Sequence, residues 1–397
     1  MIDDSLLDDP AALQRADHEH ALLGLAGAGA RVRNALRLAE AAGLAGLRPD
    51  GRPRTVLVAG HGAALTAGSV LEALAVTSTQ IAALPPHDVT HLAHGHHGTP
   101  AFTAGLVWQL PGWAGPLDLV VLATADGGEQ GLVSLAQQAY ARGCAIAVIA
   151  PAESLLAEAA PQVRALPLPY VPAAPVDTEE DLRPAEADLP AEEVGALWAF
   201  LTPLLALTER IGVTQLPEGS LEATADRLDE LAVRCRPDAA AYTNPAKDLA
   251  AQLSGTVPLL WADGALTAVA AERFAAMLAE RAGRPALPGV LPQVLTAHRG
   301  MLVAKLGGAA DPDDFFRDRV DEPDPLLLQV VLLRRAAAVE DEFTDPGYAV
   351  SRARRLADAH GVRTSDLSTA ETDPLQALAE LIALADFAAV YLTLATP

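Results

Sequence analysis

The stretch Thr55-Val56-Leu57-Val58-Ala59-Gly60-His61-Gly62 decides the fold class of this chain. Its apolar half predicts a strand buried on both faces, and its glycine turn opens a helix predicted over 63–75. The same order recurs further along, with strands predicted over 118–122 and 144–149 and a helix over about 129–142. Buried strands that alternate with helices are typical of a parallel sheet covered on both faces.

A second α/β pattern occupies the other half of the chain. Strands are predicted over 257–261 and 326–333, and helices over about 192–211, 218–235, 245–254, 266–282 and 373–394. Residues before 48 are predicted to be helical, and 171–192 are rich in Pro, Asp and Glu, as solvated linkers are. We therefore expect an α/β protein with two αβα sandwich domains: a helical segment (1–50), a first domain (51–170), a linker and connecting helix (171–212) and a second domain (213–397).

The charge balance excludes several classes of protein. The 397 residues include 28 basic and 51 acidic ones, so the net charge is −23. Such a charge argues against nucleic acid and anionic membranes as partners. Half the residues are hydrophobic, which excludes intrinsic disorder. With only two cysteines, an acidic N-terminus and no segment apolar and long enough to be expected in a membrane, the sequence predicts a cytoplasmic protein.

Two loops follow predicted strands and are candidate binding sites. In open α/β sheets the ligand lies at the carboxyl ends of the strands. Gly60, His61 and Gly62 form the first loop, where glycines and a helix N-terminus favour an anion, although a tight turn needs the same glycines without a ligand. Thr124, Gly127 and Gly128 belong to the second. There Asp126 places a carboxylate where a phosphate would sit, so phosphate binding stays open.

Histidines gather in one segment, and two further residues are candidates for acid–base chemistry. Residues 87–97 hold His87, His91, His94, His96 and His97, which could bind a metal, but without a Cys or Asp/Glu cluster we expect a solvated loop and no metal site.

Glu280 ends a predicted helix, whose dipole would raise the pKa of its carboxyl group toward that of a general base. An exposed Glu280 paired with Arg284 is the alternative, and His298 has no partner close in sequence.

Several segments resemble the two-domain sugar isomerase (SIS) proteins, closest to the bifunctional phosphoglucose/phosphomannose isomerase family. The resemblance covers about residues 50–397. It is carried by residues 56–62, by Gly128-Glu129-Gln130, by the Asn-Pro-Ala-Lys segment 244–247, by 280–286 around Glu280, by His298, and by 386–392.

The resemblance implies a chemistry. Such enzymes interconvert aldose and ketose phosphates through a cis-enediol, with Glu280 moving the proton and His298 assisting ring opening. In the family this histidine comes from the partner subunit, so a homodimer is implied, and no cofactor is needed. Gly60, His61, Gly62, Thr124, Gly127, Gly128 and Lys247 would bind the substrate, a sugar phosphate or other carbohydrate derivative.

The chain also departs from the family pattern. Ala63-Ala64 removes a serine hydroxyl from the first loop, residues 123–128 lack most of the hydroxyls of the family's phosphate loop, and Glu192-Glu193 stand where an arginine is expected. Each lost charge-assisted hydrogen bond is worth about 1.5–3 kcal/mol. Two hypotheses follow: an isomerase that uses Glu280 and His298, or a non-catalytic SIS protein that binds a carbohydrate derivative or a partner protein.

Overall fold

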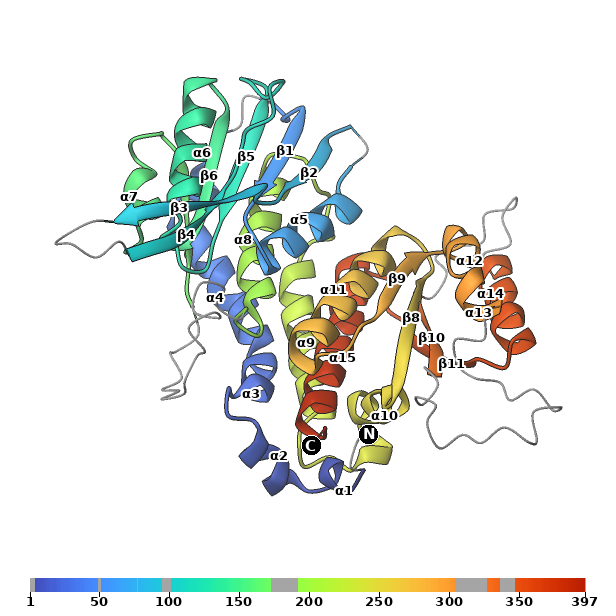
Figure 1. Cartoon of the computed structure of the whole chain (residues 1–397). Helices are drawn as coiled ribbons and strands as arrows, with labels where there is room; N and C mark the ends of the chain where they lie inside the picture. Colours follow the sequence, from blue (N-terminus) through green and yellow to red (C-terminus); the bar gives the residue numbers. More distant parts are fainter. Residues whose placement is uncertain are drawn as a thin grey trace, which may run out of the picture. The chain divides into compact units, whose positions relative to one another are not determined.

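The computed structural model describes residues 4–48, 51–76, 78–94, 101–172, 192–303, 327–335 and 347–396, with only the backbone of 4–5, 88–94 and 101–104. The chain divides into two compact units (Figure 1). Residues 19–229 form the first unit. Residues 230–397 form the second together with residues 1–18, so the N-terminal residues pack with the C-terminal half of the chain.

The first unit is built on a five-stranded parallel sheet in the order β2-β1-β5-β6-β7. Its strands are β1 (Thr55–Ala59), β2 (Gln80–Leu84), β5 (Asp118–Ala123), β6 (Ala145–Pro151) and β7 (Leu166–Tyr170). Its helices are α3 (Ala21–Ala26), α4 (Ala28–Ala41), η1 (Leu44–Gly46), α5 (Ala63–Leu74), α6 (Gln130–Ala141), α7 (Leu155–Ala159) and α8 (Ala196–Arg210). Helix α9 (Ser220–Arg234) crosses the division between the units.

Both faces of the first sheet are buried, as the unbroken apolar runs predict. Leu57, Val120 and Val148 belong to one apolar core with Leu132 of α6 and Leu156 of α7. Helices α5 and α8 pack together on the other face (Figure 1). The predicted parallel sheet is therefore confirmed, with β2 and β7 as the strands that local patterns did not reveal.

The second unit contains a four-stranded parallel sheet in the order β11-β10-β8-β9. The strands are β8 (Thr256–Ala262), β9 (Leu287–Val290), β10 (Leu327–Arg335) and β11 (Arg363–Thr369). The helices are α1 (Asp4–Leu7), α2 (Pro10–Ala16), η2 (Ala241–Thr243), α10 (Pro245–Leu253), α11 (Ala265–Ala282), α12 (Gln293–Ala297), α13 (Arg299–Val303), α14 (Tyr348–Ala359) and α15 (Pro374–Leu394). Both sheets thus have the predicted parallel α/β architecture.

The prediction for the histidine-rich segment is partly wrong. Residues 88–94 form a strand, β3 (Asp88–His94), which pairs antiparallel with β4 (Ala101–Val107) in a separate two-stranded sheet. Its partner strand supplies the hydrogen bonds that a polar segment lacks on its own, so local composition favoured a loop. His96 and His97 lie outside the described residues, and the side chains of His91 and His94 are not described.

Helix α15 corrects the expectation that no segment could span a membrane. It is the one helix among the described residues that is long and apolar enough, and 89% of its apolar window is buried within the structure. One residue of α15, Asp386, forms a buried ion pair with Arg273 of α11. The two side chains, Arg273 and Asp386, are 3% and 4% exposed. An apolar helix buried in this way is also what the core of an α/β domain requires.

Lys247 holds the N-terminal residues against the second unit, which leaves it little freedom to bind substrate. Its side chain is fully buried, and its ammonium donates to the carbonyl oxygens of Leu7 at 2.5 Å, Pro237 at 2.7 Å and Ala239 at 2.8 Å. An ammonium group has three donors, so all are used. Asn244 caps the same helix by accepting from the amides of Ala246 and Lys247. The Asn-Pro-Ala-Lys segment therefore has a structural role.

Replacing Lys247 by methionine should destabilise the second unit. Lys247→Met leaves one buried and two partly buried carbonyl groups without their donor, so we expect the free energy of unfolding to fall by about 2–4 kcal/mol in urea denaturation. Arg352→Met, which removes an exposed cation from α14, is the control. Equal stability of the two variants would show that the Lys247 contacts make no net contribution to the free energy of unfolding.

Candidate functional site

The carboxyl edge of the first sheet brings the two predicted loops together. β1 and β5 are neighbours, with Ala59 opposite Leu122, and the chain leaves β1 toward β2 on one side and leaves β5 toward β6 on the other. A ligand in such a sheet binds in the crevice at this switch point. Gly60–Gly62 follow β1 and Thr124–Glu129 follow β5, so the topology places both loops where the sequence predicts a site.

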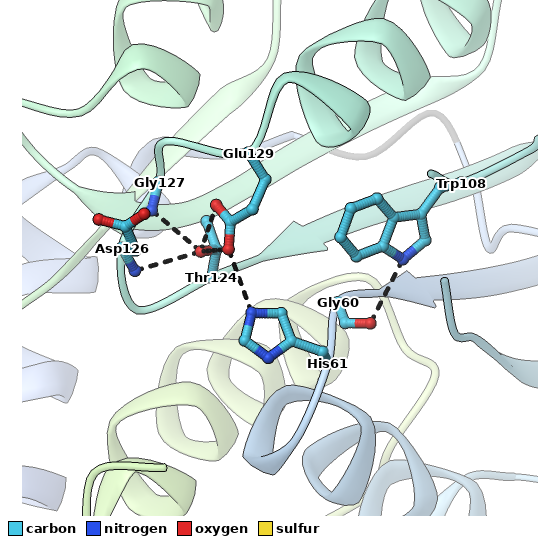
Figure 2. Close-up of polar contacts among 7 residues, drawn as sticks. All are labelled: Gly60, His61, Trp108, Thr124, Asp126, Gly127 and Glu129. Atoms are coloured by element: carbon cyan, nitrogen blue, oxygen red, sulfur yellow. Dashed lines mark hydrogen bonds and ion pairs between the residues drawn. The ribbon is translucent and has the colours of Figure 1, made fainter. Parts of the chain in front are cut away.

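The hydroxyl of Thr124 is the centre of this site (Figure 2). It lies 2.7 and 2.8 Å from the carboxylate oxygens Oε1 and Oε2 of Glu129 and donates its single hydrogen to this carboxylate. Its oxygen accepts from the backbone amides of Asp126 at 3.2 Å and Gly127 at 3.0 Å. The amides of Asp126 and Gly127, which could otherwise bind a phosphate, thus donate to the Thr124 side chain of the same loop.

His61 completes the network from the other loop. Its Nε2 lies 3.1 Å from Oε1 of Glu129, and its side chain is 42% exposed (Figure 2). The hydrogen bond to Glu129 raises the pKa of His61, although partial burial works against it. Burial would raise the pKa of Glu129, but the hydrogen bonds from His61 and Thr124 outweigh it and lower that pKa. The two side chains therefore form an ion pair when His61 is protonated.

Further carboxylates surround His61. Besides Glu129, the charges of Glu192 and Asp126 help to raise the pKa of His61. A Cβ on Gly62 would lie 2.5 Å from Oε2 of Glu192, so that carboxylate sits directly against the first loop. All three charges favour a cation at the position of His61, so an anionic ligand placed beside them would be repelled.

Packing within the chain explains two of the glycines. A Cβ on Gly60 would lie 2.5 Å from the carbonyl oxygen of Ala123, so β1 and β5 approach too closely for any side chain there. Gly127 has φ +72°, and a Cβ would lie 2.3 Å from Ser154, the N-cap of α7. The tight-turn alternative for the first loop therefore accounts for Gly60, and packing against Ser154 accounts for Gly127. Gly128 stands beside the Asp126 carboxylate.

An arginine from a distant part of the sequence pairs with one of the two glutamates that stand where an arginine was expected. Arg31 of α4 forms an ion pair with Glu193, which also accepts a hydrogen bond from the hydroxyl of Tyr170 at 2.8 Å. Burial, together with the Glu193 charge, raises the pKa of Tyr170 well above its usual range. No local motif around residue 193 could reveal Arg31, because 162 residues separate them in the sequence.

Glu280 and His298 lie in different surroundings within the second unit. Glu280 is in the last turn of α11 and its side chain is 35% exposed, with Arg281 Nη2 at 3.8 Å. His298 joins α12 to α13 and is buried, and its Nδ1 lies 3.0 Å from the indole Nε1 of Trp261. Burial lowers the pKa of His298. Trp261, on β8, is a partner that sequence spacing did not reveal.

Comparisons with known proteins agree with this architecture. The family of the bacterial phospho-glucose isomerase C-terminal SIS domain matches residues 242–396. A hypothetical protein from Thermus thermophilus superposes with a TM-score of 0.59 at 15% identity, over 98% of this chain and 89% of its own. The chain has a two-domain SIS fold.

Other solved structures extend the likeness, which at these identities concerns the fold alone. A provisionally assigned phosphosugar isomerase of Salmonella typhimurium LT2 has a TM-score of 0.54 at 14% identity, covering 92% of each chain. The C-terminal domain of glucosamine-fructose-6-phosphate aminotransferase from Francisella tularensis has 0.51 at 10%, covering 94% of this chain and 96% of that one. No curated protein matches the sequence.

The described part of the candidate site offers no set of side chains suited to a metal. Within the described residues, no group of three or more His, Cys, Asp or Glu side chains is placed to hold an ion. A cavity of about 400 Å³ in the first unit is lined by residues such as Asp118, Ala145 and Leu166. These three residues begin β5, β6 and β7, so that cavity belongs to the amino edge of the sheet and not to the candidate site.

The His61–Glu129 pair predicts a pH-dependent stabilisation. Because the His61 pKa is raised above 6.5, the contribution of His61 to the free energy of unfolding is complete below pH 6.5 and is lost as the pH rises through the folded pKa. Because the Glu129 pKa is lowered below 4.5, the contribution of Glu129 to the same free energy is complete above pH 4.5 and is lost as the pH falls through the folded pKa. The pair therefore stabilises most between those two values. NMR titration should show the His61 pKa falling in Glu129→Gln.

A matched control separates this pair from general charge effects. Glu158→Gln removes one exposed carboxylate from the same unit. It should leave the His61 titration close to that of the wild type. An unchanged His61 pKa in Glu129→Gln would contradict the ion pair.

Proposed function

We propose that this SIS protein binds a carbohydrate derivative at the carboxyl edge of the first sheet and does not depend on a phosphate group for affinity. The observation that carries the proposal is the Thr124 hydroxyl, which occupies the amides of Asp126 and Gly127 and donates to Glu129. The SIS fold and the switch point favour a ligand at this edge. The internal carboxylate disfavours a phosphate in the loop.

The free energy that hydrogen bonds give to a bound phosphate shows how strongly the loop could prefer a phosphorylated sugar. A phosphate held by several charge-assisted hydrogen bonds gains about 1.5–3 kcal/mol from each, hence orders of magnitude in affinity. Here a phosphate would first have to displace the Glu129 carboxylate from Thr124 and then lie beside Asp126. The other polar groups at this edge of the sheet, His61 and its carboxylate neighbours, suit the hydroxyl or amino groups of a carbohydrate.

Calorimetry with matched sugar pairs tests this proposal. Fructose and glucosamine should bind within about tenfold of fructose 6-phosphate and glucosamine 6-phosphate, because the loop adds little for the phosphate. His61→Ala should weaken all of them, whereas His87→Ala, which removes an exposed histidine of the same unit, should not. A preference of more than a hundredfold for the phosphorylated sugars would contradict the proposal, and so would a failure of all these sugars to bind.

A second candidate function is aldose–ketose isomerisation of the glucose 6-phosphate/mannose 6-phosphate type. It is favoured by the family match over residues 242–396, which includes both Glu280 and His298. In this proposal Glu280 moves the proton between C1 and C2 through a cis-enediol, and His298 assists ring opening. The proposal includes a cytoplasmic homodimer, since the resemblance implies that the histidine acts across the subunit interface.

A turnover assay tests the second candidate. Fructose 6-phosphate should give glucose 6-phosphate or mannose 6-phosphate, and Glu280→Gln should reduce kcat by at least a hundredfold while Glu272→Gln, an exposed glutamate two turns earlier in α11, should not. Turnover that persists in Glu280→Gln would reject Glu280 as the base. Absence of product with the wild type at high protein concentration would reject the isomerase and leave the binding proposal standing.

A further inference from the structure

We infer that Trp261 is a positioning residue that holds His298 as a neutral imidazole with its proton on Nε2. The part that His298 would play in catalysis rests on the second proposed function. The tautomer itself does not, because it follows from the contact between the two side chains.

The geometry of the contact fixes the roles of the two nitrogens. Trp261 is 0% exposed in the buried strand β8, and its indole nitrogen is 3.0 Å from Nδ1 of His298. An indole N–H can only donate, so Nδ1 must accept through its lone pair. A neutral imidazole that accepts at Nδ1 carries its hydrogen at Nε2.

The surroundings of His298 keep the ring in this position. Trp261 packs in one apolar core with Val294 and Leu295 of α12, the helix that His298 ends, and with Leu302 of α13. The backbone amide of His298 donates to the carbonyl of Val294 at 2.8 Å, and its own carbonyl accepts from the amide of Met301 at 3.1 Å. Main chain and side chain are therefore both held, and burial favours the uncharged ring.

This arrangement limits the chemistry that His298 can perform. A proton added at Nδ1 would point at the indole N–H, so protonation has to break the contact with Trp261. His298 then serves as a hydrogen-bond donor through Nε2, for example to the ring oxygen of a sugar, and not as a base. Proton removal from carbon is left to another group, for which Glu280 is the candidate.

The tautomer can be read by NMR on protein labelled with ¹⁵N-histidine and ¹⁵N-tryptophan. The signal assigned to His298 by its loss in His298→Gln should show a protonated Nε2 and an unprotonated Nδ1 near pH 8. Trp261→Phe removes the donor and should give a mixture of tautomers. Trp108→Phe is the matched control, because the Trp108 indole donates to a backbone carbonyl, that of Gly60, at 3.3 Å.

A wild-type measurement keeps the inference testable if Trp261→Phe does not fold. A scalar coupling across the hydrogen bond between Nε1 of Trp261 and Nδ1 of His298 should be observed. A proton on Nδ1, the absence of this coupling, or an unchanged tautomer in folded Trp261→Phe would each overturn the inference. These results do not depend on turnover, so they are distinct from failure of the isomerase proposal. If turnover is found, Trp261→Phe should lower kcat more than it changes KM.

Discussion

The hydrogen bond from Thr124 to Glu129 is the constraint on which the candidate site depends. The Thr124 oxygen accepts from the amides of Asp126 and Gly127, so these donors are occupied at the carboxyl end of β5, the place where an α/β sheet binds a ligand. The Thr124 hydroxyl in turn donates to Glu129, so the loop holds a carboxylate of its own (Figure 2). The same carboxylate then pairs with His61, so one side chain links both loops of the switch point.

Charge reinforces what the hydrogen bonds establish. The sequence has an excess of 23 negative charges, and three of the carboxylates, those of Asp126, Glu129 and Glu192, act on His61. A ligand anion would meet this negative charge at short range in a partly buried site, where screening by salt is weak. A sugar hydroxyl or an amino group meets no such penalty. This charge is the reason why the proposed function has the site bind the body of a carbohydrate rather than its phosphate.

The sequence was sufficient for the fold and insufficient for the contacts at the candidate site. The apolar runs at 55–59 and 118–122 predict buried strands because no other local structure suits them, and the glycine turns then mark the carboxyl edge. The edge strand β11, Arg-Thr-Ser-Asp-Leu-Ser-Thr, is polar and gains its structure from pairing with β10. Contacts such as Arg31 with Glu193 join distant residues, so no local pattern contains them.

Several residues of the family resemblance have structural contacts. Asn244 caps a helix, Lys247 holds the N-terminal residues, and His298 accepts a hydrogen bond from Trp261. A resemblance at a short motif therefore transfers a fold more safely than it transfers a function.

The most direct test of the central claim is to remove the internal carboxylate and measure phosphate affinity. In Glu129→Ala the Thr124 hydroxyl loses its acceptor and the site loses one negative charge. Calorimetry with fructose 6-phosphate should then show an affinity at least about tenfold higher than that of the wild type. Unchanged or weaker binding in a folded Glu129→Ala protein would contradict the claim that Glu129 occupies the place of a phosphate.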